Sequence, residues 1–112
     1  MDADLKIARV RTTLMLKYPF FGSCAMKLNF IEEDVIETMA TDGKSVFWCR
    51  DFVDSHTQEQ ITGVVAHEIM HVVMRHHMRI GERDKQKWNK ATDYAINDIV
   101  VREGFVLPMM RY

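Results

Sequence analysis

Residues 61–74 read ITGVVAHEIMHVVM, and this stretch decides how the chain folds. On a helix, at about 100° per residue, its apolar side chains cover nearly the whole circumference, which is typical of a helix buried on most sides. The polar exceptions are Thr62, His67, Glu68 and His71, and the last three share a sector of about 100°. Burying three ionisable groups together is costly unless something compensates them, and a divalent cation would do so.

The spacing of these three side chains is that of a zinc site. Histidines at i and i+4 project from one helix face one turn apart, so His67 and His71 can bind a single zinc ion. Glu68 lies beside them, where its carboxylate can take a proton from a zinc-bound water whose pKa the metal lowers. It can then pass the proton to the leaving amine of a peptide bond. The motif therefore predicts a zinc-dependent metallopeptidase, rather than three polar residues that share a buried helix by accident.

A catalytic zinc usually has three protein ligands and one open position. Asp93, with Asn97 one turn later among small and apolar residues, is the favoured third ligand, and a capping or salt-bridge carboxylate is the alternative. His77 follows His71 at the spacing of the metzincin motif, but Met74 stands where that motif needs glycine. On an unbroken helix His77 would lie about 9 Å beyond His71 and point elsewhere. We interpret four further residues as weaker candidates: His56, His76, Asp98 and Glu103.

The order of predicted elements, an N-terminal helix, then strands, then two helices, indicates an α+β domain. Residues 5–18 have helical spacing and end before Pro19, after which residues 20–22 read as a turn. Two-residue alternation over 26–31, and a hairpin of 38–41 with 44–49 about Asp42-Gly43, predict a small, mostly antiparallel sheet.

Two helices follow the predicted sheet. Thr57 and Gln60 form a capping box for a helix that should run from about residue 58 to about Ile80, where Gly81 is a natural stop. Residues 87–102 form another helical pattern, which ends at Gly104.

Composition excludes several classes of protein. With 112 residues the chain is expected to be one domain, and its net charge of −1 gives no basic field for nucleic acid. The dense basic stretch from Arg75 to Lys90 is interrupted by acidic residues, and we interpret it as a solvated helix end and turn. No apolar run approaches the ~20 residues of a membrane span, and no signal peptide is recognisable. Cys24 and Cys49 fit a reduced state, so we expect a cytoplasmic protein without a membrane partner.

At this point the motifs resemble a known family. The strings AHEIMHVVMRH (66–76) and WNKATDYAINDIVVREGFVLP (88–108), with YPFFGSCAMKLNF (18–30) and TDGKSVFW (41–48), resemble the metallopeptidase domain found upstream of von Willebrand factor A-like domains in bacterial proteins. The resemblance implies a zincin-like fold, with His67 and His71 as ligands, Glu68 as general base and Asp93 as third ligand. Longer relatives continue into further helices and the partner domain, so over residues 1–112 we expect a truncated or minimal version.

The expected substrate is a peptide or protein, with Zn²⁺ as the one cofactor. In zincins the substrate lies along an edge strand beside the metal helix, which here suggests part of Ser45 to Cys49. Gly63, one turn before His67, would leave room for substrate or for a neighbouring element. Two alternatives are a metal-stabilised interaction module without turnover and a hydrolase of a non-peptide bond. Glu68 favours the peptidase, because a structural zinc site needs no base and normally has four protein ligands.

Overall fold

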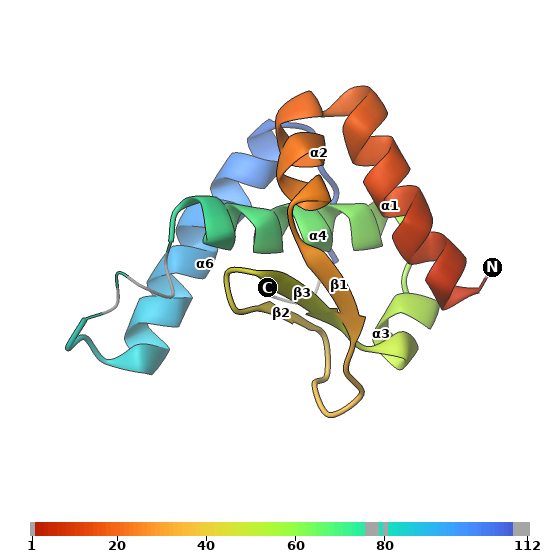
Figure 1. Ribbon diagram of the computed structural model, residues 1–112. Helices are drawn as coiled ribbons and strands as arrows, with labels where there is room; N and C mark the ends of the chain where they lie inside the picture. Colours follow the sequence, from red (N-terminus) through yellow and green to blue (C-terminus); the bar gives the residue numbers. More distant parts are fainter. Residues whose placement is uncertain (1, 76–78, 80, 109–112) are drawn as a thin grey trace.

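The order of elements follows the predicted order of helix, strands and helices. The computed structural model describes residues 2–75, 79 and 81–108 (Figure 1). Within them the chain forms α1 (Ala3–Lys17), α2 (Pro19–Met26), β1 (Asn29–Glu32), β2 (Met39–Thr41), β3 (Ser45–Trp48), α3 (Arg50–Asp54), α4 (Gln58–Val73) and α6 (Lys85–Arg102). Five helices and one three-stranded sheet in the described residues confirm the α+β class.

The histidine-bearing helix α4 is the central element (Figure 1). Helices α1, α2 and α6 pack on it, and so do strands β2 and β3. Every residue from Ile61 to Met70 is buried, as the nearly continuous apolar circumference predicted. No described helix, α4 included, is both long and apolar enough to cross a membrane.

The start of α4 is held by its own cap and by α1. Thr57 and Gln60 form the predicted capping box: the Thr57 hydroxyl accepts the Gln60 N–H at 3.1 Å, and the Gln60 side-chain carbonyl accepts the Thr57 N–H at 2.9 Å. The side-chain amide of Gln58 donates to the Lys6 carbonyl oxygen of α1 at 2.9 Å. These contacts fix where α4 begins relative to α1.

The end of α4 differs from the prediction. The helix ends at Val73 and not near Ile80. The prediction took Gly81 as the residue that ends the helix. In the structure Arg75 has the left-handed conformation (φ 55°) that is usually found at a glycine after a helix. The Arg75 N–H closes the turn on the Val72 carbonyl at 3.0 Å. Helix α4 therefore ends two residues after the second histidine.

The predicted hairpin is confirmed. Strands β2 and β3 pair antiparallel on either side of Asp42 and Gly43. Gly43 has φ 94°, a conformation that costs glycine little. The Asp42 carboxylate accepts the N–H groups of Lys44 at 2.9 Å and Ser45 at 2.8 Å, and these bonds hold the pKa of Asp42 below its ordinary value.

The sheet as a whole is mixed, and the expectation of a mostly antiparallel sheet is wrong. Strand β1 pairs in parallel with β3, so the order is β1-β3-β2 and β3 is central. Strand β1 also begins later than predicted, because Met26 is the last residue of α2. Alternation of apolar and polar residues shows which side chains face the core, but it does not show which strands pair or in which direction.

Of the helices other than α4, two were predicted correctly and two were not. Helix α1 and helix α6 agree with the predicted ranges to within a few residues. The turn predicted at residues 20–22 is wrong, because Pro19 occupies the first position of helix α2, where its missing N–H is not needed. The short α3 was not predicted.

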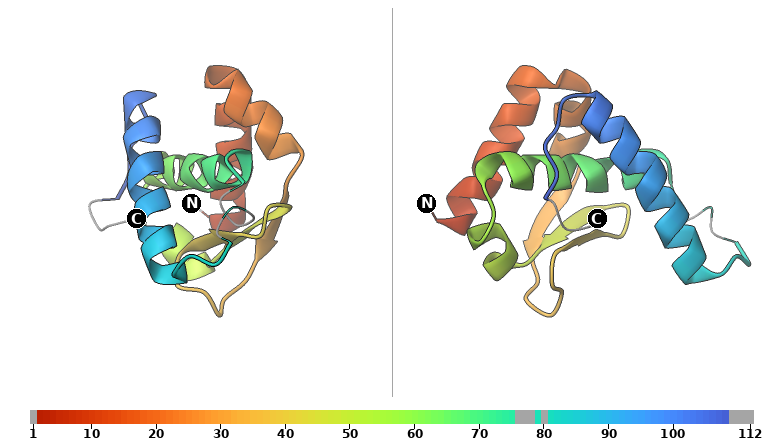
Figure 2. Two further views of the ribbon diagram at one scale, coloured as in Figure 1. Left: turned by 90° about the vertical axis from the view of Figure 1, so that its left-hand side faces the viewer. Right: turned by 180° about the vertical axis from the view of Figure 1, so that it is seen from behind.

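The segment after α6 turns back and crosses α4 (Figure 2). Gly104, with φ 97°, ends α6 as predicted. Phe105 is buried against α1 and α2: its ring centroid lies 4.2 Å from that of Tyr18 and 5.0 Å from that of Phe21. This aromatic contact ties the end of α6 to the N-terminal helices.

The same segment crosses α4 very closely at Gly63. A Cβ added at Gly63 would collide with the carbonyl oxygen of Val106 and would lie 2.8 Å from its carbonyl carbon. The element for which Gly63 leaves room is therefore the C-terminal segment of the chain itself.

We expect Gly63→Ala to destabilise the protein. Overpacking costs about 1–3 kcal/mol, and the gain in helix propensity offsets at most about 1 kcal/mol of it. A net loss of 1 kcal/mol would lower the melting temperature by about 4–8 °C, which thermal denaturation measures. Glu59→Ala, an exposed change in the same helix, is the control and should shift it little. A melting temperature for Gly63→Ala at or above that of the wild type would contradict the close crossing.

Candidate metal centre

Two helices bring three metal-binding side chains together. His67 and His71 project from α4, and Asp93 projects from α6, 26 and 22 residues further along the chain. Asp93 Oδ1 lies 3.1 Å from His67 Nε2 and 2.9 Å from His71 Nε2, and the two Nε2 atoms are 3.1 Å apart. The structure thus brings together the three residues that the sequence predicted as ligands, and they form a candidate metal site.

The site is closed on one side and open on the other. The side chain of His67 is 1% exposed, that of His71 is 17% exposed and that of Asp93 is 36% exposed. The imidazole rings meet edge to face, at 72° and with 4.8 Å between centroids. Exposure therefore increases from His67 toward Asp93, so a ligand would enter from the α6 side.

The donor atoms fit a divalent transition metal. Two imidazole nitrogens and a carboxylate oxygen suit zinc and similar ions. Ligands at about 2.0–2.1 Å around a tetrahedral zinc stand about 3.3 Å from one another. The three atoms here are 2.9–3.1 Å apart, so the triangle needs to widen by only a few tenths of an ångström. A cation at the centre of this triangle would bind the lone pairs of the three donor atoms, which otherwise face one another.

Comparison with known proteins agrees with this arrangement. A family model described as "Putative metallopeptidase domain" matches residues 2–112. The chain belongs to this family. No curated protein and no solved structure matches it, so the zincin-like fold stays a prediction.

Glu68 is a second carboxyl group close to the candidate metal site in this member of the family. It follows His67 directly on α4 and is 5% exposed. Burial, and to a lesser degree the negative charge of Asp93, raise the pKa of Glu68 well above its ordinary value. Burial thus favours the neutral form of this carboxyl group. A cation among the neighbouring ligand atoms would favour the charged form and bring the pKa part of the way back.

The pKa of Asp93 is shifted in the opposite direction. Burial alone would raise its pKa, but the hydrogen bonds from His67 and His71, together with their charge, outweigh burial and hold the pKa of Asp93 below its ordinary value. The surroundings therefore shift the two carboxyl groups in opposite directions: the pKa of Asp93 is lowered and that of Glu68 is raised.

The weaker candidates that the structure describes lie in other settings. Asp98 pairs with Arg102 on the exposed face of α6 at 3.1 Å, and Glu103 is the exposed C-cap of that helix. His56 Nδ1 lies 2.8 Å from the Phe52 carbonyl oxygen, with its ring stacked over Phe52. None of these three belongs to the described ligand cluster.

His76 and His77 lie outside the described residues. On an unbroken helix His77 would point away from the site, but α4 ends at Val73, so this reason for excluding it no longer holds. The case for Asp93 rests instead on its position against both histidines.

The strand expected to bind substrate is not available. Residues 45–48 of the predicted Ser45–Cys49 edge form β3, which pairs with β1 on one side and β2 on the other. An edge strand must have an unpaired side, so that expectation is wrong. Strand β2 lies at the edge of the described sheet and packs against α4.

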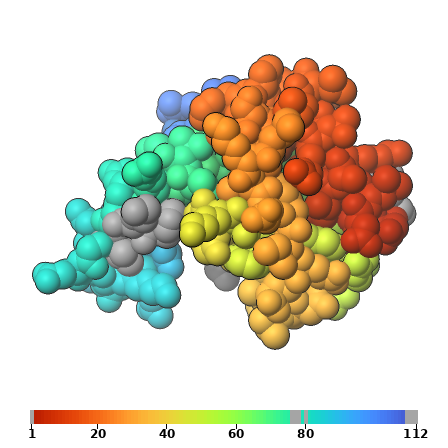
Figure 3. Space-filling view, in the orientation of Figure 1, coloured from red at the N-terminus to blue at the C-terminus, as the bar shows by residue number. Residues whose placement is uncertain are grey.

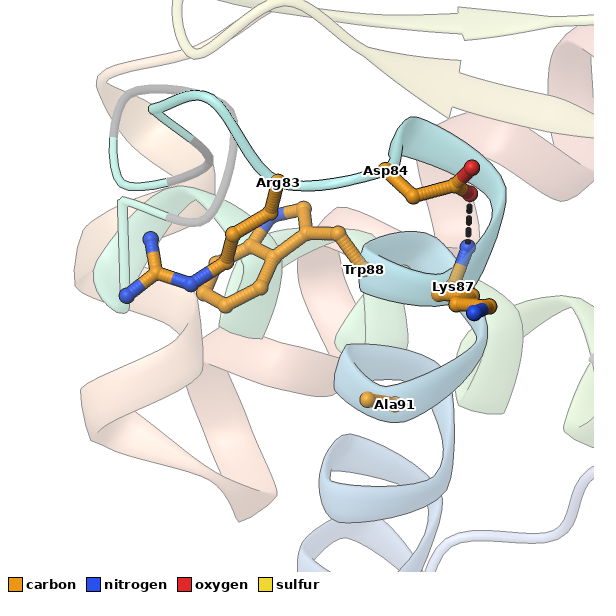
Figure 4. A pocket seen from close by; sticks show the side chains of 5 residues that line it. All are labelled: Arg83, Asp84, Lys87, Trp88 and Ala91. Carbon is orange, nitrogen blue, oxygen red and sulfur yellow. Dashed lines mark hydrogen bonds between the residues drawn. The ribbon is translucent and has the colours of Figure 1, made fainter.

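A hollow lies near the start of α6 (Figure 4). By helical geometry, at about 100° per residue, Asp84, Trp88 and Ala91 face the side of α6 away from Asp93. Arg83 covers the indole of Trp88 at 4.9 Å from the ring centroid. The hollow is lined by Arg83, Asp84, Lys87, Trp88 and Ala91.

Proposed function

We propose that this chain is a zinc-dependent metallopeptidase in which His67, His71 and Asp93 hold the metal and Glu68 is the general base. The observation that carries the proposal is the convergence of one carboxylate oxygen and two imidazole nitrogens beside a buried carboxyl group. Three ligands leave one position open on a four-coordinate zinc, as in catalytic sites. In this proposal the fold is zincin-like, with two ligands on the central helix and the third on the helix that follows.

The chemistry divides between the metal and Glu68. Zinc bound there would supply a Lewis acid that lowers the pKa of water and polarises a peptide carbonyl. Glu68 would accept the proton that the attacking water gives up, because a bound cation would favour its charged form. The protonated Glu68 would then return that proton to the nitrogen of the leaving amine. The C–N bond breaks, and the carboxylate of Glu68 is restored for the next turnover.

The substrate would lie along β2 rather than β3. A peptide in extended form can add to the unpaired side of an edge strand through its backbone, without regard to most of its sequence. Strand β2 is at the edge of the described sheet and packs on the helix that carries the histidines. The substrate class is accordingly a peptide or an unfolded segment of a protein.

One observation favours a second function. Because Asp93 comes from α6 and the histidines from α4, a metal would also join two helices. A metal-stabilised interaction module without turnover would use the same ligands. It would have no need of the buried Glu68, and this is why we favour the peptidase.

Metal removal tests the proposal directly. We expect the zinc-loaded chain to cleave members of a mixed peptide library, followed by mass spectrometry. A chelator should abolish cleavage and added zinc should restore it, because the ligands have no other way to activate water. Stoichiometric zinc with no cleavage of any peptide would favour the interaction module instead.

A further inference from the structure

The charge of the chain is divided unevenly. Residues 75–90 contain six Lys and Arg against two Asp and Glu, a net charge of +4, so the rest of the chain carries −5 to give −1 overall. We define the basic arm as the described cations of this stretch: Arg75, Arg79, Arg83, Lys85, Lys87 and Lys90. The arm lies at one end of the molecule, around the start of α6 (Figure 3).

The cations of the basic arm are exposed, and most of them form no ion pair within the described part of the chain. All six side chains are exposed. Among the described residues, no ion pair joins a carboxylate to Arg75, Arg79, Lys85, Lys87 or Lys90. The nearby Asp84 carboxylate accepts the Lys87 N–H at 2.9 Å and caps α6 (Figure 4). Elsewhere, by contrast, Arg50 contacts three carboxylates at 3.0–3.3 Å.

The arm is close to the metal centre. Lys90 precedes Asp93 by three residues on α6, which places their Cβ atoms about 5–6 Å apart. Lys87 is a further turn away, about 9 Å along the helix axis from Asp93. Arg75 follows His71 by four residues. These separations are comparable to the screening length of about 8 Å at physiological salt, so the charges act on whatever occupies the site.

We propose that the basic arm selects acidic peptides as the substrates of this metal centre, an inference that rests on the proposed peptidase function. Lys90 is the lysine nearest Asp93 on α6. Lys87 lies about 120° round the helix from Asp93, where it lines the hollow, and adds positive charge at longer range. An extended peptide rises about 3.3 Å per residue, so side chains about two to four positions from the scissile bond reach these lysines. Asp or Glu at those positions would be attracted, and Lys or Arg repelled.

A nucleic acid fits the same surface less well. Affinity for a phosphate backbone depends on many cations along a continuous track. Here the positive stretch is short and the remaining chain carries −5, which would repel a long polyanion. A short acidic segment of a peptide needs only the local charge.

The test is a binding measurement on the zinc-loaded Glu68→Gln protein, which holds peptides without cleaving them. Fluorescence anisotropy compares paired peptides that differ only in Asp/Glu against Asn/Gln, two to four positions on either side of a central bond. We expect the acidic member to bind about tenfold more tightly at low salt, with the difference shrinking as salt screens the charges. In this background Lys87→Glu with Lys90→Glu should remove or reverse the preference.

A matched control separates local from overall charge. Arg9→Glu with Lys17→Glu makes the same change in net charge on exposed residues of α1, at the other end of the molecule, and should keep the preference. Equal binding of acidic and neutral peptides, or loss of the preference in the control as well, would overturn the inference and leave the peptidase proposal standing. Binding of no peptide at all would overturn both. Tighter binding of an oligonucleotide of equal charge would overturn the choice of a peptide ligand.

Discussion

Glu68→Gln should leave zinc binding unchanged and reduce peptide cleavage by about 10²–10⁴-fold, the usual contribution of a general base. Zinc is retained because Glu68 supplies none of the three converging ligand atoms. The fold is retained because glutamine has nearly the same shape and fits a position that is 5% exposed. The measurement combines metal analysis, with about one zinc per chain expected in both proteins, with cleavage of a peptide library.

The control for this change lies on the same helix. Glu59→Gln replaces an exposed carboxylate of α4 and should cleave peptides as the wild type does. Equal cleavage by wild type and Glu68→Gln would show that another group takes the proton. Zinc in both proteins with cleavage by neither would instead support the interaction module.

Asp93→Ala should weaken zinc binding more than His77→Ala does. Its carboxylate oxygen lies within 3.1 Å of both imidazole nitrogens, so its loss removes one of three ligands. Changes to outer-shell partners already cost about 10–100-fold in metal affinity, so loss of a direct ligand should cost more than about 100-fold. Competition with a chromophoric chelator measures the dissociation constant of each variant.

Asp98→Ala is the matched control for Asp93→Ala. Asp98 is on the same helix, but it is exposed and pairs with Arg102. Its removal should leave zinc affinity unchanged. The reverse order, with His77→Ala the more damaging change, would refute Asp93 as the third ligand and assign that place to His77.

The central helix and the candidate site could be predicted from the sequence because both rest on local patterns. An apolar stretch with only a few polar residues in one sector must be buried, and the polar residues in it must have partners. His67, His71 and Asp93 stood out for this reason, and the structure brings them together. The capping box at Thr57 and the Asp42-Gly43 turn are equally local signals, and both are confirmed.

The features that could not be predicted depend on residues distant in sequence. Nothing in the alternating pattern of β1 indicates that β3 would lie beside it in parallel. Arg75 follows α4 in a left-handed conformation for which arginine has no preference, so the local sequence gives no signal for it. The crossing of Val106 over Gly63 has one signal in the sequence, which is a glycine inside an apolar helix. Such a glycine indicates that another segment approaches closely, but it does not show which segment.

In the proposed site the ligands come from two helices, so the affinity for metal depends on the equilibrium between molecules in which α6 is packed on α4 and molecules in which it is not. Ile96 and Val100 of α6 are fully buried, while residues 85–91 of its first two turns are exposed apart from the partly buried Trp88. In any molecule in which α6 were not packed on α4, Asp93 would be absent from the site and only the two histidines would remain. The apparent dissociation constant then rises in inverse proportion to the fraction of molecules in which α6 is docked. A substitution that touches no ligand can thus change metal occupancy, simply by changing how much of the time the two helices are together.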